Sequence, residues 1–142
     1  MKIIKLSILL LLSVFIISGC ESVEEAQNAA DEFFEAYNNE DEAKMESLLD
    51  QESVIDAGIK GDFYNVFDQQ WQAYGKVIDY ERYGFQTNTN NGLTTVVLRF
   101  NADTETGGKI YIKLRFVKRS DGYKVFVYEY NTSKSVIDKP EE

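Results

Sequence analysis

The 142-residue chain contains no histidine, one cysteine and one proline. The absence of histidine removes the commonest metal ligand and the side chain whose unperturbed pKa lies nearest to neutrality. A single cysteine excludes an internal disulfide. Basic residues are also few: the chain has 15 of them and 24 acidic residues. The resulting formal charge of −9 disfavours nucleic acid as a partner. With 44% hydrophobic residues, the chain is long and apolar enough for one folded domain.

The first 19 residues predict a secretory signal peptide. Two early lysines are followed by an apolar stretch over residues 6–17 and then by small residues. That stretch is shorter than the roughly 20 residues that a membrane-spanning helix needs. The segment Ile17-Ser18-Gly19-Cys20 resembles the lipobox of bacterial lipoproteins, which implies that the leader is cut after Gly19 and that Cys20 is lipidated. The expected location is therefore a bacterial membrane, with palmitate-type chains holding the domain on the extracytoplasmic side.

Lipidation of Cys20 would use the only thiol of the chain, so neither a cysteine-ligated metal nor a thiol nucleophile would remain. The alternative is an ordinary signal peptide or anchor in which Cys20 has no role.

No glycine-rich phosphate loop, Walker pattern or Gly-x-Ser-x-Gly elbow occurs in the sequence, and we therefore expect no cofactor. Acidic residues gather over residues 41–50 without the spacing of a calcium-binding loop, so no metal site is expected there.

The hydropathy pattern predicts a helical half followed by a strand half. Apolar residues recur every three or four positions from Val23 to Tyr37, again over residues 43–49, and from Phe63 to Tyr74. From residue 76 the period changes to two, which indicates β-strands. We expect four strands, over residues 76–87, 93–103, 109–119 and 123–131, with turns at Asn91-Gly92 and Asp121-Gly122. Helices packed on one face of a curved four-stranded antiparallel sheet make an α+β fold.

This order of elements resembles the cone-shaped fold of the nuclear transport factor 2-like superfamily, which includes ketosteroid isomerases and many small bacterial lipoproteins. The resemblance is carried by residues 33–41 (FFEAYNNED), 75–77 (GKV) and 121–125 (DGYKV). The alternative is a cystatin-like roll or another helix-on-sheet domain. The expected organisation is a signal peptide over residues 1–19, a lipidated N-terminus at 20–21, the domain over 22–131 and a frayed tail over 132–142.

In this superfamily the sheet and helices enclose an apolar cavity, in which enzymes commonly place an Asp–Tyr or Asp–His pair. The absence of histidine leaves only the pair with tyrosine. If Asp121-Gly122 is a two-residue turn, Glu129 lies opposite Leu114 and faces the helices as a pocket carboxylate. Otherwise Glu129 lies in water at the rim of the cone. Trp71 and the neighbouring aromatic residues of its helix either line a ligand cavity or belong to the core.

The same strand register places Phe126, Tyr128 and Tyr130 on the outer face of the sheet, away from the helices. Three further apolar or aromatic residues complete this face: Val97, Tyr111 and Val117. An apolar face of this kind is a candidate interface for a homodimer or for another envelope protein. A monomer whose tyrosines only stiffen the sheet is the alternative.

Two classes of function remain. The first is a non-catalytic, lipid-anchored envelope domain that binds a partner or a small apolar ligand. The second is an isomerase- or hydrolase-like enzyme that uses a carboxylate in the pocket. The expected partners are therefore the membrane, through the lipid anchor, and an envelope protein, a second copy of the chain or a small apolar ligand.

Overall fold

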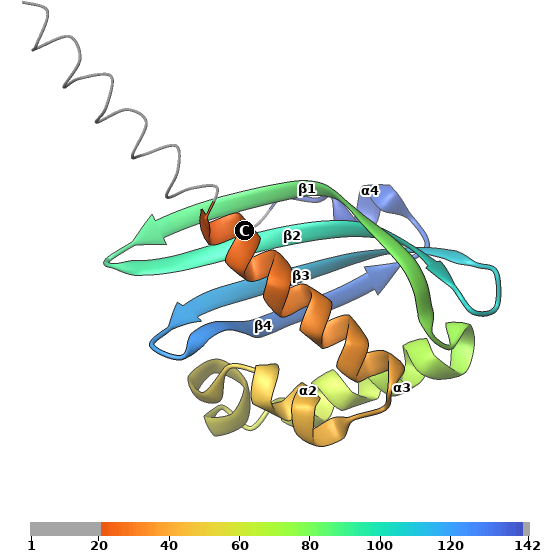
Figure 1. Cartoon of the computed structure of the whole chain (residues 1–142), viewed down its shortest axis with the longest axis horizontal. Coiled ribbons are helices and arrows are strands. Elements are labelled where there is room, and N and C mark those ends of the chain that lie inside the picture. Colours follow the sequence, from red (N-terminus) through yellow and green to blue (C-terminus); the bar gives the residue numbers. More distant parts are fainter. Residues whose placement is uncertain (1–20, 141–142) are drawn as a thin grey trace, which may run out of the picture.

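The computed structural model describes residues 21–140, so the predictions for the signal peptide and for Cys20 lie outside the described residues. Residues 21–38 are helical and precede α2 (Glu42–Leu48), the π-helix η1 (Gln51–Asp56) and α3 (Lys60–Tyr74). The strands are β1 (Val77–Asn90), β2 (Leu93–Thr104), β3 (Lys109–Arg119) and β4 (Gly122–Asn131), and the short helix α4 (Lys134–Ile137) follows them (Figure 1). The predicted order of helices and then strands is confirmed.

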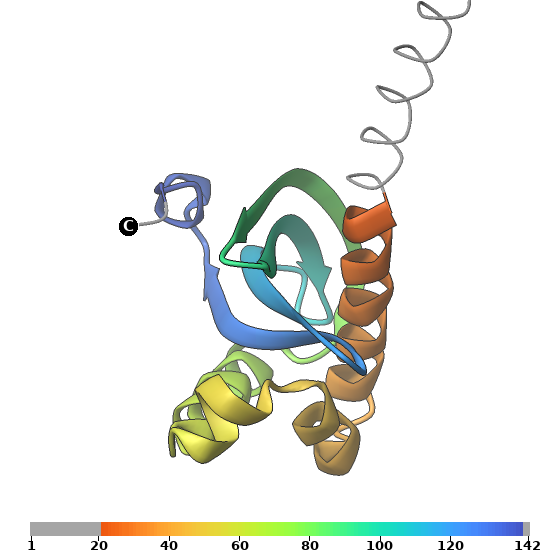
Figure 2. The same cartoon turned by 90° about the vertical axis from the view of Figure 1, so that its left-hand side faces the viewer.

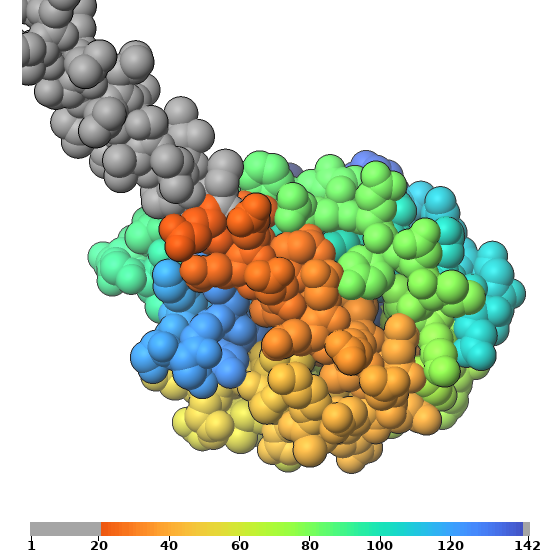
Figure 3. All heavy atoms as spheres, in the orientation of Figure 1, coloured from red at the N-terminus to blue at the C-terminus, as the bar shows by residue number. Residues whose placement is uncertain are grey.

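The four strands form one antiparallel meander in the order β1-β2-β3-β4. The sheet curves strongly, with the first helix along one flank and α2, η1 and α3 below it (Figure 2). The space-filling view shows side chains of the first helix between β1 and the β3–β4 hairpin (Figure 3). The α+β prediction of helices packed on a curved four-stranded antiparallel sheet is therefore confirmed. Within residues 21–140, no helix is both long and apolar enough to cross a membrane.

Aromatic side chains fill the space between the helices and the sheet. Phe33 of the first helix lies 5.4 Å from Phe67 of α3, and Phe34 lies 5.3 Å from Phe100 of β2, measured between ring centroids. The alternating apolar residues of β3 face the same space and are fully buried: Ile110, Ile112, Leu114 and Phe116. Both periodicities in the sequence thus point to one shared core.

Two turns follow their sequence signals closely. Asn91 and Gly92 have φ angles of 52° and 77° between the paired residues Asn90 and Leu93, as a two-residue hairpin turn with two left-handed positions requires. Gly75 ends α3 with a φ of 70°, and its N–H donates to the carbonyl of Trp71 at 2.8 Å.

The end of the first helix is tied directly to the start of the sheet. Asn38 donates from Nδ2 to the carbonyl of Val77 at 2.8 Å, and its Oδ1 accepts from the N–H of Val77 at 2.8 Å. This two-point contact imitates a pair of strand hydrogen bonds. It fixes the position of the preceding residue, Tyr37, which lines the site described below.

The register of β3 and β4 differs from the prediction. Arg119 pairs with Gly122, so the tight turn is Ser120-Asp121, and a bulge then leaves Phe126 unpaired between Val125 and Val127. An extra residue in one strand reverses the faces of all residues beyond it. A bulge of this kind has no signal in the alternation of the sequence, and it changes the placement of three predicted site residues.

After the bulge, Tyr128 pairs with Leu114 and Tyr130 pairs with Ile112, so both tyrosines face the helices. The prediction that they lie on the outer face is therefore wrong. Glu129 pairs with Lys113 and faces outward, where its carboxylate lies 3.1 Å from the Lys113 ammonium. The hypothesis of an inward-facing Glu129 is wrong for the same reason.

The chain itself covers part of the outer face of the sheet. Helix α4 packs against β3 and β4 on the side opposite the first helix, and its Ile137 is only 1% exposed (Figure 2). Arg99 donates to the carbonyl of Ile137 at 3.2 Å, and the Tyr83 hydroxyl donates to Asp138 at 2.7 Å. The prediction of a frayed tail is thus wrong for residues 134–138, because a buried isoleucine and two side-chain contacts hold them.

Candidate functional site

Within residues 21–140, Gln70 of α3 and Tyr128 of β4 form a buried polar pair in the interior of the cone. The Tyr128 hydroxyl donates to Oε1 of Gln70, and the rings of Phe33 and Phe67 lie 5.3 and 5.1 Å from the Tyr128 ring. Burial raises the pKa of Tyr128 well above its usual value, so the phenol stays protonated at alkaline pH as well as at neutral pH. Nε2 of Gln70 has no hydrogen-bond partner among the described residues.

A carboxylate suited to acid–base work does not accompany this pair. Among residues 21–140 the one buried carboxyl group belongs to Asp50, which lies beside Arg119 at the end of β3. Glu129 points away from the interior. The interior therefore combines aromatic rings with a neutral amide and a neutral phenol, within the part of the chain that the structure describes.

One cleft that opens to solvent lies directly in front of this interior, between the first helix, α2 and α3. We call it the aromatic cleft, and it has a volume of about 60 Å³. It is lined by Tyr37, Glu40, Glu42, Met45, Tyr64, Phe67, Asp68 and Trp71. Trp71 is half-buried here, so it packs against the core on one side and borders the cleft on the other.

The aromatic walls of the cleft are held in place by their own polar atoms. The hydroxyl of Tyr37 donates to the carbonyl of Gly75 at 3.0 Å, and the hydroxyl of Tyr64 donates to the carbonyl of Glu42 at 3.2 Å. The rings of Tyr37 and Trp71 meet edge to face, 5.4 Å apart and inclined by 71°. Because these hydroxyls are engaged with the backbone, the cleft presents ring surfaces in a fixed arrangement.

Gly75 is required for this arrangement. Its φ of 70° lies in the left-handed region, and a Cβ added to it would come 2.6 Å from Oε2 of Glu105. A larger residue would strain the backbone at this φ and displace the Glu105 side chain, whose Oε2 accepts from the N–H of Lys76 at 3.1 Å. The glycine that ends α3 thus also positions one wall of the cleft.

The rim of the cleft is acidic. Glu40 follows the first helix, Glu42 opens α2 and Asp68 lies on α3, so three elements each contribute one carboxylate. Burial raises the pKa of the Tyr64 hydroxyl, and the negative charges of Glu46 and Glu42 raise it further. The field at this wall of the cleft is therefore negative.

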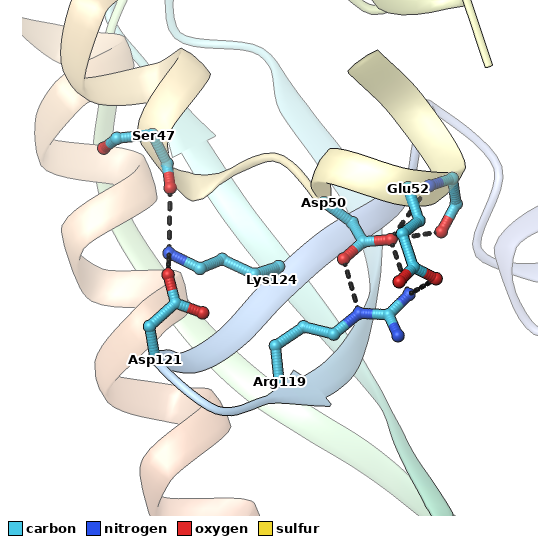
Figure 4. A network of polar contacts seen from close by, with 7 residues as sticks. Ser47, Asp50, Glu52, Arg119, Asp121 and Lys124 are labelled. Atoms are coloured by element: carbon cyan, nitrogen blue, oxygen red, sulfur yellow. Dashed lines mark hydrogen bonds and ion pairs between the residues drawn. The ribbon is translucent and has the colours of Figure 1, made fainter. Parts of the chain in front are cut away.

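The position of α2 depends on an ion pair at the end of the sheet (Figure 4). Nε and Nη2 of Arg119 donate to the two carboxylate oxygens of Asp50 at 2.8 and 2.9 Å. Ser53 donates to the same carboxylate from its backbone N–H at 3.0 Å and also from its hydroxyl. The Arg119 guanidinium, aided by Ser53, holds the pKa of Asp50 at about 2 although burial opposes this.

Further contacts join the same segment to β4. Lys124 donates to the carbonyl of Ser47 at 3.0 Å and pairs with Asp121 at 3.3 Å (Figure 4). Leu49 forms a parallel bridge with Val125. The chain just after α2 is thereby fixed to the sheet, and α2 carries two residues of the cleft, Glu42 and Met45.

The predicted site residues therefore lie in three separate places. Trp71 lines the aromatic cleft, and Tyr128 lies behind it. Tyr130 packs at 6.1 Å against Tyr74 and lines a strand-end hollow of about 470 Å³ between α3 and β4, which Glu129 and the far side of Tyr128 also border. Phe126 lines an outer groove of about 570 Å³ and lies 4.9 Å beneath the guanidinium of Arg115.

Two residues of the cleft, Tyr37 and Tyr64, are not among the site residues predicted from the sequence. Tyr64 lies outside the apolar stripe of α3, which runs through positions 63, 66, 67, 71 and 74. An aromatic residue beside the apolar stripe of a helix, rather than within it, indicates a partly exposed side chain that can form the wall of a cleft. Tyr37 was assigned to the core stripe, and it is indeed buried, yet one side of its ring borders the cleft.

No family model and no curated protein matches the sequence. Solved structures do match the fold. A proposed dehydratase of the NTF2-like (nuclear transport factor 2-like) family from Streptomyces avermitilis is 14% identical, with a TM-score of 0.56, over 79% of this chain and 96% of that chain. An NTF2-like protein of unknown function from Shewanella baltica is 11% identical, with a TM-score of 0.52, over 79% and 94% of the two chains. The chain thus has the NTF2-like α+β fold.

Proposed function

We propose that this protein is a lipid-anchored bacterial envelope lipoprotein whose NTF2-like domain binds a small molecule in the aromatic cleft without transforming it. One observation carries the proposal: the half-buried side chains of Tyr64 and Trp71, with the buried Tyr37 against Trp71, form a preformed concave wall that is open to solvent, whereas the core behind them is packed with side chains. Concave aromatic surfaces with a few polar groups at their edge are the usual form of small-molecule sites.

The proposed anchor and the cleft lie at opposite ends of the first helix. Residues 21–37 are helical, so at 1.5 Å per residue Tyr37 lies about 25 Å along the axis from the segment that follows Cys20. In Figure 1 the cleft elements α2 and α3 lie at the far end of this helix. This placement supports a cleft that faces away from the membrane and receives soluble ligands.

An isomerase- or hydrolase-like enzyme is the second candidate, because a proposed dehydratase shares the fold. Such an enzyme would have to use Glu40, Glu42 or Asp68, which are the carboxylates that border the cleft. All three are exposed. General acid–base catalysis at neutral pH usually relies on a carboxyl group whose pKa is raised by burial, and the exposed positions of these carboxylates therefore favour binding over catalysis.

The experiment is a small-molecule screen on the full chain purified in dodecyl maltoside, read out by ligand-induced shifts of the unfolding temperature. Binding compounds should lose their effect in Tyr64→Leu and keep it in Phe85→Leu, which changes an exposed aromatic residue outside the cleft. Mass spectrometry after incubation should recover each compound unchanged. The proposal would be contradicted if a chemically broad set of compounds gave no shift of the unfolding temperature, or gave equal shifts in the two variants. Recovery of a chemically converted compound would favour the enzyme.

A further inference from the structure

We infer that the ligand of the aromatic cleft is an organic cation that carries a quaternary ammonium group. This inference rests on the proposed binding function and adds the chemical class of the ligand. Three features carry it: the ring surfaces, the charge at the rim and the size of the cleft.

The ring surfaces suit a cation without N–H donors. Tyr37, Tyr64 and Trp71 contribute three of the side chains that line the cleft, and the electron-rich faces of such rings attract cations. A primary ammonium gains most from several buried hydrogen-bond acceptors, whereas the carboxylates that line this cleft, those of Glu40, Glu42 and Asp68, are exposed at its rim. The hydrogens of the Tyr37 and Tyr64 hydroxyls are directed to backbone carbonyls, and the wall therefore offers mainly ring surface, which suits methyl groups that share a positive charge.

The charge of the rim has the complementary sign. Glu40, Glu42 and Asp68 border the cleft, and its lining includes neither lysine nor arginine. Two lysines on the same helices are engaged elsewhere, since Lys44 pairs with Glu32 at 3.8 Å and Lys60 pairs with Glu46 at 3.1 Å. The carboxylates of residues 21–140 do not gather in any group of three that could hold a metal ion. The charge is thus spread around an aromatic wall, as a diffuse organic cation requires.

The size of the cleft limits the part of the ligand that enters. Its volume of about 60 Å³ corresponds to about four to six water-sized positions, which is comparable to the heavy atoms of one tetraalkylammonium head group. The rest of a larger ligand would extend into solvent past the rim. Recognition by this cleft would therefore depend on the head group.

The test is a titration of the full chain in dodecyl maltoside with tetramethylammonium chloride, followed by fluorescence. Trp71 is the only tryptophan, so emission excited at a wavelength that tyrosine does not absorb reports on a residue that lines the cleft. A second comparison uses choline and its neutral analogue 3,3-dimethyl-1-butanol. The two molecules have the same shape and differ in that carbon replaces the charged nitrogen. Choline should bind about tenfold more tightly than its neutral analogue. Added salt should weaken the binding of choline and leave the binding of the neutral analogue unchanged.

Two cleft variants and one control complete the design, and all of them keep Trp71. Asp68→Asn and Tyr64→Leu should each weaken tetramethylammonium binding severalfold, whereas Asp62→Asn, on the same helix but outside the cleft, should leave it unchanged. Equal binding of choline and the neutral analogue would overturn the inference and leave the cleft as an apolar binding site. A saturable response that is unchanged in both cleft variants would also overturn it. The absence of any response to either probe would overturn the inference, while the broader screen would still decide the proposed function.

Discussion

Asp50 and Arg119 are 69 residues apart in the chain and form a two-point ion pair, with Nε 2.8 Å from Oδ1 and Nη2 2.9 Å from Oδ2. The carboxylate is 1% exposed, whereas the guanidinium side chain retains 26% exposure and also meets Glu52 at 3.3 Å. Because Asp50 directly follows α2 and Leu49, this pair connects the helical wall of the cleft to the end of β3.

The first prediction concerns the pH dependence of stability. The pKa of Asp50 falls from 3.8 to about 2 on folding. The ionised carboxylate therefore contributes to the free energy of unfolding fully above pH 3.8, and this contribution is lost as the pH falls toward 2. A shift of this size corresponds to about 2 kcal/mol. Urea unfolding should show Asp50→Asn to be less stable than wild type by about that amount at pH 6, with the gap closing toward pH 2. A difference in stability between the two proteins that does not change with pH would show that the ionisation of Asp50 does not stabilise the fold.

The second prediction treats Gln70 and Tyr128 as a unit. Tyr128→Phe should destabilise the protein by about 1–3 kcal/mol, because it leaves the buried Oε1 of Gln70 without its donor. Adding Gln70→Leu should recover most of that loss, since the double variant removes both polar groups together. Chemical denaturation of the two single variants and the double variant measures the coupling. Strictly additive losses would show that the two side chains do not depend on each other.

The third prediction separates stability from binding at Glu40. This residue has a φ of 51° and closes the first helix, with the N–H of Asp41 donating to the carbonyl of Ala36 at 2.9 Å. Glycine suits such a left-handed position, so Glu40→Gly should stabilise the fold by about 1 kcal/mol. It should also weaken cation binding, because one rim carboxylate is lost.

The control for this prediction is Asn91→Gly, at a left-handed position of φ 52° in the β1–β2 turn, away from the cleft. It should change stability in the same direction by a smaller amount, because asparagine tolerates this conformation better than glutamate. Tetramethylammonium binding should stay at the wild-type level in Asn91→Gly. If Glu40→Gly were also to bind as wild type does, Glu40 would have no part in the site.

The fourth prediction concerns the anchor. Metabolic labelling with a fatty acid should mark the wild-type chain and leave Cys20→Ser unlabelled, because this cysteine is the only one in the sequence. The serine variant should also keep its leader and migrate as a larger species. Equal labelling of the two chains would exclude Cys20 as the attachment point.

The fold could be predicted from the sequence because its elements have strong local signals. The apolar stripe from Val23 to Tyr37 and the alternation from Ile110 to Phe116 each identify one buried face. The observed strands differ from the predicted ranges by at most a few residues at their ends, as is usual for boundaries. The turn at Asn91-Gly92 was predicted for the same reason, since its residue types match the required φ angles.

The candidate site could be predicted only in part, because it depends on relations between distant segments. The bulge at Phe126 decides which way Tyr128 and Tyr130 point, and it is fixed by the pairing of two strands rather than by either sequence alone. The aromatic cleft likewise combines side chains from three helical elements whose approach depends on Asp50 and Arg119. Of the predicted site residues, only Trp71 lines that cleft.

The measurement that tests the central claim most directly is a set of nuclear Overhauser effects between the methyl protons of bound tetramethylammonium and the aromatic protons of the protein. A ligand in the aromatic cleft lies against Trp71 and Tyr64, so the methyl protons should show effects to these two rings. Effects to Phe126 in the outer groove or to Tyr130 in the strand-end hollow, with none to Trp71, would contradict it.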